Sequence, residues 1–125
     1  MYIIEMTSSS AATPGLVEGM IVSIEPGYYE PHNFGVRLEN LYVVSKATRV
    51  ASSDLFLEFK PLTFIPFQRS LINVHLLSEA QLCWLNSYHD NVVAEISSMM
   101  KLKSELDWLH RACKPMISNG FSQDV

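Results

Sequence analysis

The 125-residue chain has few cysteines and no long apolar run. Its two cysteines, Cys83 and Cys113, lack CxxC spacing, so no disulfide framework or thiolate metal site is indicated, and we expect buried, reduced thiols. No run approaches the roughly 20 apolar residues that span a bilayer. The opening Met1–Met6 is too short for a signal peptide and is interrupted by Glu5. We therefore predict no membrane association and a cytoplasmic location.

Basic residues are also scarce. Nine Lys and Arg residues face thirteen Asp and Glu residues, which gives a net charge of −4. A nucleic-acid binder would show a basic face, so we predict no nucleic-acid partner.

The opening segment, MYIIEMTSSSAATPG, contains neither Asp nor His. The chain is rich in apolar residues, at 48%, and its length suits one domain with a sizeable core.

The most informative stretch is Gly19–Asn40, in which two strand-like runs flank a turn rich in Pro, Gly and Asn. Alternation along residues 20–25 and 36–44 places Glu25 on one face of the first run, and Arg37 and Glu39 on one face of the second. If the runs pair antiparallel, the two carboxylates approach each other. Carboxylates that meet in a sheet interior repel and lose solvation, and the usual remedy is a metal ion or a buried arginine. Arg37 makes the second remedy available.

The same stretch carries a family resemblance. IEPGYYEPHNFGVRLEN resembles the C-terminal catalytic region of Xaa-Pro aminopeptidases (aminopeptidase P), and the resemblance continues through PLTFIP, WLNSYH and ELDWLHRACKPM. The order of these motifs points to aminopeptidase P rather than to prolidase or methionine aminopeptidase. The resemblance implies an α+β chain, the C-terminal part of a pita-bread fold, with a curved, mainly antiparallel sheet followed by two C-terminal helices.

The resemblance also implies a metal site. Glu25 and Glu39 match the family's two glutamate ligands for two divalent ions, with manganese expected, and Arg37 is a possible support. The family removes an N-terminal residue that precedes proline, and its bound metals polarise the scissile carbonyl and activate water. Its other three ligands, two Asp and one His, precede the EPG motif, where this chain has neither residue type. We therefore expect an incomplete site and a chain that is inactive alone.

Several further residues have two interpretations. Either Tyr28 or Tyr29 lines the active-site wall, or both pack over the hairpin. His32, in the turn, is expected to be exposed rather than a ligand. His89 falls within the apolar stripe of a predicted helix, where a satisfied interior histidine is favoured over a functional one.

The remaining chain suggests three parts: a divergent, flexible segment at 1–15, a partial pita-bread domain at 16–117 and a flexible tail at 118–125. A polar loop is predicted at 48–54, and strands at 55–59 and 62–67, with Lys60-Pro61 between them.

Two helices follow these strands. Ser78 and Gln81 form a capping-box pattern at the start of a helix whose stripe runs through Leu82, Leu85, His89, Val92, Ile96 and Met99. A second helix spans about Leu102 to Cys113 and ends before Lys114-Pro115. Trp84, Tyr88 and Trp108 are candidate interface anchors, with packing inside the chain as the alternative.

These observations leave three hypotheses for function. The chain is part of an Xaa-Pro aminopeptidase and does no chemistry alone, or it completes a site in trans with a missing N-terminal catalytic half, or it is a non-catalytic interaction module. A peptide with proline in second position is the substrate only if the site is completed. Exposed strand edges and apolar surface predict a homo-oligomer.

Overall fold

The computed structural model describes residues 15–47 and 56–117. The chain divides at Thr63 and Phe64 into two compact units. We call the described residues up to Thr63 the strand unit and those from Phe64 onward the helical unit. The predicted flexible segment at 1–15, apart from its last residue, the loop at 48–54 and the tail at 118–125 lie outside the described residues.

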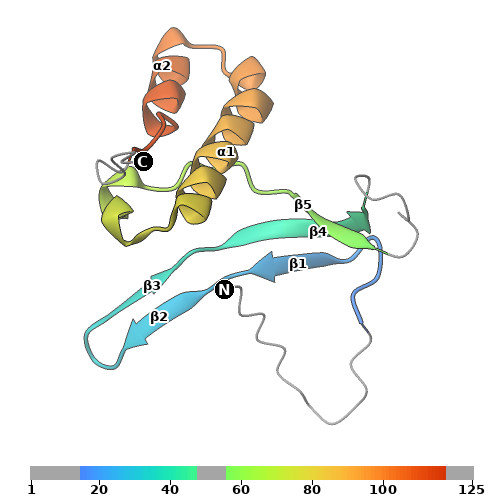
Figure 1. Ribbon diagram of the computed structural model, residues 1–125. Helices are drawn as coiled ribbons and strands as arrows, with labels where there is room; N and C mark the ends of the chain where they lie inside the picture. The colour runs from blue at the N-terminus through green and yellow to red at the C-terminus, as the bar shows by residue number, and fades with distance from the viewer. Residues whose placement is uncertain (1–14, 48–55, 118–125) are drawn as a thin grey trace, which may run out of the picture. The chain divides into compact units, whose positions relative to one another are not determined.

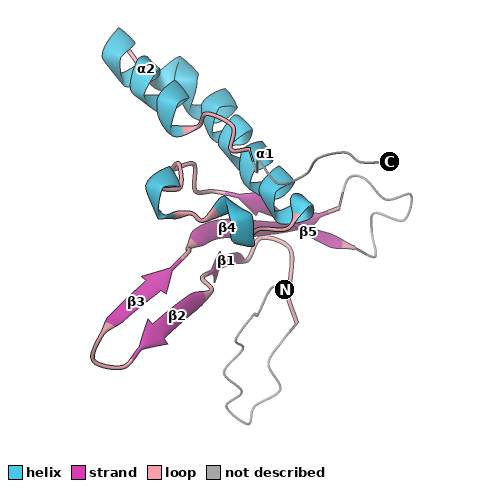
Figure 2. Cartoon of the chain, turned by 60° about the vertical axis from the view of Figure 1, so that its left-hand side comes forward, coloured by secondary structure: helices cyan, strands magenta, loops and turns pink. Residues whose placement is uncertain are grey.

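The strand unit contains two antiparallel sheets. β1 (Ile21–Ile24), β4 (Asn40–Lys46) and β5 (Leu57–Pro61) form a three-stranded sheet in the order β1-β4-β5. β2 (Gly27–Glu30) and β3 (Phe34–Arg37) form a separate two-stranded sheet. Figure 1 shows β1, β4 and β5 side by side, and Figure 2 shows β2 and β3 as a ribbon ending in a tight turn.

The two sheets share one hairpin register. Ile24 pairs with Asn40 in the first ladder and Gly27 pairs with Arg37 in the second, so no residue is gained or lost between the ladders. The backbone N–H of Leu38 donates to the Pro26 carbonyl over 3.0 Å across the gap. The predicted antiparallel pairing of the two runs is therefore confirmed.

The tip of this hairpin is a tight turn. The Asn33 N–H donates to the Glu30 carbonyl at 3.1 Å, and His32 has a positive φ of 62°. Proline at the second turn position with a positive φ at the third is typical of a type II turn. His32 is exposed, as expected.

The structure corrects the predicted strands after residue 55. β5 runs through Lys60 to Pro61, and residues 62–67 form no strand. Pro61 is the last residue of β5, which is an edge strand of the sheet, where proline is tolerated. Beyond it the Leu62 N–H still donates to the Leu41 carbonyl at 2.8 Å, but the Leu41 N–H donates to the Thr63 hydroxyl at 2.9 Å. A side chain thus replaces the backbone acceptor, and the ladder ends.

The helical unit contains α1 (Glu79–Ile96) and α2 (Lys103–Ala112), which confirms the two predicted helices. The capping box is present: the Gln81 N–H donates to Ser78 Oγ at 3.3 Å, and the Ser78 N–H donates to Gln81 Oε1 at 2.9 Å. Met99, predicted as the end of the α1 stripe, lies beyond the helix in a short 3-10 turn and is 68% exposed.

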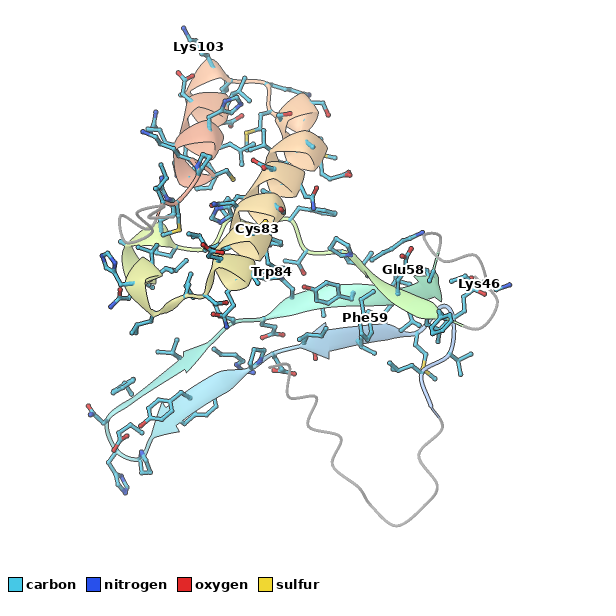
Figure 3. All side chains as sticks on the ribbon, in the orientation of Figure 1. Lys46, Glu58, Phe59, Cys83, Trp84 and Lys103 are labelled. Atoms are coloured by element: carbon cyan, nitrogen blue, oxygen red, sulfur yellow. The ribbon has the colours of Figure 1, made fainter. Side chains whose placement is uncertain are left out.

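The core of the helical unit lies between its two helices. Tyr88 and Val92 of α1 pack with Leu109 of α2 and with Cys113, which follows it, and all four are buried. Burial raises the pKa of the Cys113 thiol and keeps it protonated and unreactive. Cys83 is exposed, so the expectation of two buried thiols is wrong for this residue; it lies beside Trp84 on α1 in Figure 3. No helix in residues 15–47 and 56–117 is long and apolar enough to cross a membrane.

Candidate metal centre

The two predicted carboxylates meet where the hairpin passes from one ladder to the other. Glu25 directly follows β1, and Glu39 directly precedes β4. The shared register places these residues opposite each other, and the pleat places both side chains on the same face. The predicted approach of Glu25 and Glu39 is therefore what the backbone dictates.

Arg37 bridges the pair. Its Nη1 atom lies 2.7 Å from Glu25 Oε2 and 3.9 Å from Glu39 Oε2. The first contact is a charge-assisted hydrogen bond, whereas the second is an ion pair without one. The two carboxylate oxygens thus converge on a single cationic nitrogen.

Glu25 has a second donor on the same face. The Ser23 hydroxyl donates to Glu25 Oε1 at 2.8 Å. Arg37 and then Ser23 hold the pKa of Glu25 below its usual value, because both bonds favour the charged carboxylate. Ser23 was not among the predicted site residues, although its position two residues before Glu25 in a strand was the signal that could have found it.

The face that carries the carboxylates is open in this chain. The side chains of Glu25, Arg37 and Glu39 are 43%, 48% and 51% exposed, so the carboxylates do not meet in a sheet interior as we had considered. Ile21 on the same face is 66% exposed. Solvent therefore reaches the pair, and the Arg37 contacts are those of a surface ion pair.

The two tyrosines point to opposite faces. Tyr29 lies on the carboxylate face, and its ring covers Gly27 and Gly35, where a Cβ atom would come within 2.7 Å of the ring or its hydroxyl. Tyr28 lies on the other face, with its ring 6.0 Å from that of Phe34. Its hydroxyl donates to Glu30 at 2.6 Å, which raises the pKa of Tyr28. Only Tyr29 therefore lies on the same face as the candidate site.

His89 belongs to the helical unit, whereas the candidate site belongs to the strand unit. It is fully buried on α1, and its Nε2 accepts a hydrogen bond from the Phe67 N–H at 3.1 Å. Its Nδ1 has no hydrogen-bond partner among the described residues. The imidazole is thus an interior group satisfied at one nitrogen. Burial first, and then Arg69, lower the pKa of His89 and favour its neutral form.

The candidate interface aromatics are also in the helical unit. Trp84 stacks on Tyr88 with ring centroids 5.8 Å apart and is 43% exposed. Tyr88 is only 6% exposed and its hydroxyl donates to the Ile65 carbonyl at 2.7 Å, so it has little surface to offer a partner. Trp108 on α2 is 52% exposed. An interface role stays a prediction for Trp84 and Trp108.

Glu25 and Glu39 together offer some of the ligands that a divalent cation needs. Carboxylate oxygens are the ligands that hard divalent ions prefer, and those of Glu25 and Glu39 already converge on one positive charge. Within residues 15–47 and 56–117, no group of three or more His, Cys, Asp and Glu side chains could hold a metal ion. The pair therefore fits as part of a larger ligand set.

Comparisons with known proteins agree with this architecture. The model of metallopeptidase family M24 matches residues 3–46, and that of the C-terminal region of peptidase M24 matches residues 55–116. Aminopeptidase P2 of Arabidopsis thaliana is 42% identical over 104 residues, which are 81% of this chain and 14% of the relative. The Xaa-Pro aminopeptidase app-1 of Caenorhabditis elegans is 38% identical over 99 residues, 77% of this chain and 16% of the relative. Protein pid-5 of the same organism is 39% identical over 101 residues, 78% of this chain and 10% of its own length.

A solved structure shows the same fold. The X-prolyl aminopeptidase of C. elegans, described as a cytosolic enzyme with a di-nuclear active site, matches with a TM-score of 0.69 and 37% identity over 81% of this chain and 17% of its own. The chain belongs to metallopeptidase family M24 and corresponds to the C-terminal part of the catalytic domain of Xaa-Pro aminopeptidases. The pita-bread prediction is confirmed. The chain spans 10–17% of the length of the relatives described here.

Proposed function

We propose that this chain contributes two ligands, Glu25 and Glu39, to a di-nuclear metal site that releases an N-terminal residue preceding proline. The observation that supports this proposal is the convergence of the two carboxylates on one cationic atom, within the segment that resembles Xaa-Pro aminopeptidases. The C. elegans neighbour has a di-nuclear active site, which is the kind of site that two such carboxylates suit.

Each residue of the pair's surroundings has a role in this proposal. Glu25 and Glu39 would hold the ions, and Ser23 would orient Glu25 through the hydrogen bond to Oε1. Tyr29 would form the wall of the site on the same face, where a peptide substrate would lie. Bound divalent ions would polarise the scissile carbonyl and lower the pKa of water.

We further propose that the site needs ligands beyond the described residues, so that the two-carboxylate set has no peptidase activity by itself. Two carboxylates leave most coordination positions of a divalent ion to water or to other groups. A second polypeptide or another part of the same protein would supply them. Manganese is the ion that we expect, and we propose the cytosol as the location, as described for the C. elegans neighbour.

A manganese titration followed by NMR tests the proposed ligands. Mn²⁺ broadens nearby signals even when binding is weak, so wild-type protein should lose the amide signals around Glu25 and Glu39 first. Glu25→Gln and Glu39→Gln should each weaken binding about tenfold or more, because each removes a charged ligand. Glu58→Gln is a matched control, since Glu58 lies on β5 in the same unit and pairs with Lys60 at 3.7 Å. Equal broadening around residues 25 and 39 in wild type and in both ligand variants would refute the assignment.

A second proposal concerns association with another copy of the chain. Large apolar side chains are widely exposed in the helical unit, where Leu71 and Leu76 are 83% and 80% exposed and Trp108 is 52% exposed. Exposed apolar surface on this scale favours association. Light scattering should show a mass that rises with concentration, and Trp108→Ala combined with Leu76→Ser should lower it. A constant monomeric mass would rule out this second proposal.

A further inference from the structure

The position of Arg37 bears on how a cation reaches the carboxylates. A single guanidinium nitrogen approaches Glu25 Oε2 at 2.7 Å and Glu39 Oε2 at 3.9 Å. Opposed carboxylates on neighbouring strands repel each other, and a positive charge between them relieves the repulsion. Arg37 therefore keeps the two side chains turned toward each other.

An ion bound by both Oε2 atoms would take the place that Arg37 Nη1 now holds, because that one nitrogen contacts both oxygens. Mg²⁺ binds carboxylate oxygen at about 2.0–2.1 Å, so an ion between the two Oε2 atoms would lie nearer to both of them than Arg37 Nη1 does. A divalent ion also neutralises both carboxylates, whereas one guanidinium neutralises one. The ion and Arg37 therefore compete.

The Arg37 side chain can also move away from the two carboxylates into solvent. This side chain is 48% exposed, so a guanidinium that turns into water gains hydration and loses only an exposed ion pair. The ion pair with Glu25 is likewise half exposed and is screened by salt. The cost of displacing it is therefore small but measurable.

We infer that Arg37 is a displaceable counter-charge that holds Glu25 and Glu39 together in the absence of a metal ion and moves aside when the ion binds. This inference rests on the proposed function, because it takes the two glutamates as ligands. It adds a second role for the arginine, since Arg37 both prepares the carboxylate pair and lowers its affinity for the incoming cation.

The test uses the same manganese titration with Arg37→Met. Removing an exposed competing ion pair should tighten Mn²⁺ binding on the order of two- to fivefold. Lys60→Met is the matched control, because it removes one positive charge from the same unit and frees Glu58 instead. It should change the affinity at residues 25 and 39 less than Arg37→Met does. Equal effects of the two substitutions, or weaker binding by Arg37→Met, would overturn the inference.

A second measurement needs no variant. Diamagnetic Mg²⁺ added to the wild-type protein should shift the Glu25 and Glu39 signals and also the Arg37 guanidinium signals, because Nη1 loses its contact with Glu25. Shifts at both glutamates with an unchanged Arg37 signal would refute displacement and leave the ligand assignment standing. If Glu25→Gln and Glu39→Gln do not alter metal binding, the ligand assignment itself fails, and the role of Arg37 fails with it.

Discussion

Acid should selectively weaken the helical unit through His89. The imidazole is fully buried and accepts the Phe67 N–H at 3.1 Å through Nε2, which only an unprotonated Nε2 can do. Burial and Arg69 lower the pKa of His89 from its ordinary 6.5, and Asp90 offsets only part of this shift. The folded state then binds fewer protons than the unfolded state between the two pKa values. The free energy of unfolding that neutral His89 contributes should therefore be fully present above pH 6.5. It should be lost as the pH falls through the folded-state pKa.

The size of this effect can be measured by removing the imidazole that accepts the Phe67 N–H. His89→Leu leaves the Phe67 N–H without its partner, a loss of about 1–3 kcal/mol for a buried donor. Burial of the leucine returns part of that loss, so we expect a net decrease of about 1–2 kcal/mol at pH 8. Protonation of wild-type His89 breaks the same hydrogen bond, so the difference between the two proteins should shrink as the pH falls below 6.5.

Urea unfolding followed by tryptophan fluorescence is a suitable assay, because both tryptophans lie in the helical unit. Series at pH 8, 7, 6 and 5 on wild type, His89→Leu and His110→Gln would separate the effects. His110 is exposed on α2, so its substitution should preserve the wild-type pH dependence. A difference between wild type and His89→Leu that stays constant from pH 8 to pH 5 would show that protonation of His89 does not weaken the helical unit.

Three further predictions concern the two units. Ser78→Ala removes the N-cap of α1 and should lower the free energy of unfolding by about 0.5–2 kcal/mol in the same urea assay, whereas Ser78→Asp, which can still cap, should lower it less. Leu109→Ala empties a position that is 1% exposed, and calorimetry should show a loss of about 2–5 kcal/mol; a loss below about 1 kcal/mol would mean that the core collapses around the cavity. Gly35→Ala would bring a Cβ to 2.7 Å from Tyr29 Cδ1, so a cycle with Tyr29→Ala should show a coupling of at least about 0.5 kcal/mol, and strict additivity of the two thermal shifts would contradict the contact.

The sequence predicted those parts of the fold in which local chemistry decides the outcome. Ser78 and Gln81 carry their own cap, so the start of α1 was predicted to the residue. Alternation predicted that Glu25 and Glu39 approach each other if the two runs pair antiparallel, and the register of the structure places them opposite each other. The strand prediction at 62–67 was wrong because the β4–β5 ladder stops there. The Thr63 hydroxyl accepts the Leu41 N–H in place of a backbone carbonyl. No propensity or periodicity records such a replacement.

For the candidate site, the sequence indicated which residues come together but not how exposed their side chains are. Glu25, Glu39 and Arg37 were named from the sequence, and the structure brings their side chains together, whereas Ser23 was not named. Exposure could not be predicted, because it depends on what covers the face, and the sequence of the strands says only that the face is partly polar. The pattern likewise gave no means to decide between Tyr28 and Tyr29 until the register was known.

The unbroken register of the hairpin has a consequence for engineering. The turn at residues 31–33 joins β2 to β3 at the far end of the ribbon from the carboxylates. Residues inserted there lengthen the tip and leave the pairing of Glu25 with Glu39 untouched, whereas one residue inserted between Ile24 and Glu25 would rotate that carboxylate onto the opposite face. The tip is therefore the place in this hairpin for an affinity tag or a spectroscopic label, whereas a change in the number of residues between Ile24 and Glu25 would separate the two carboxylates.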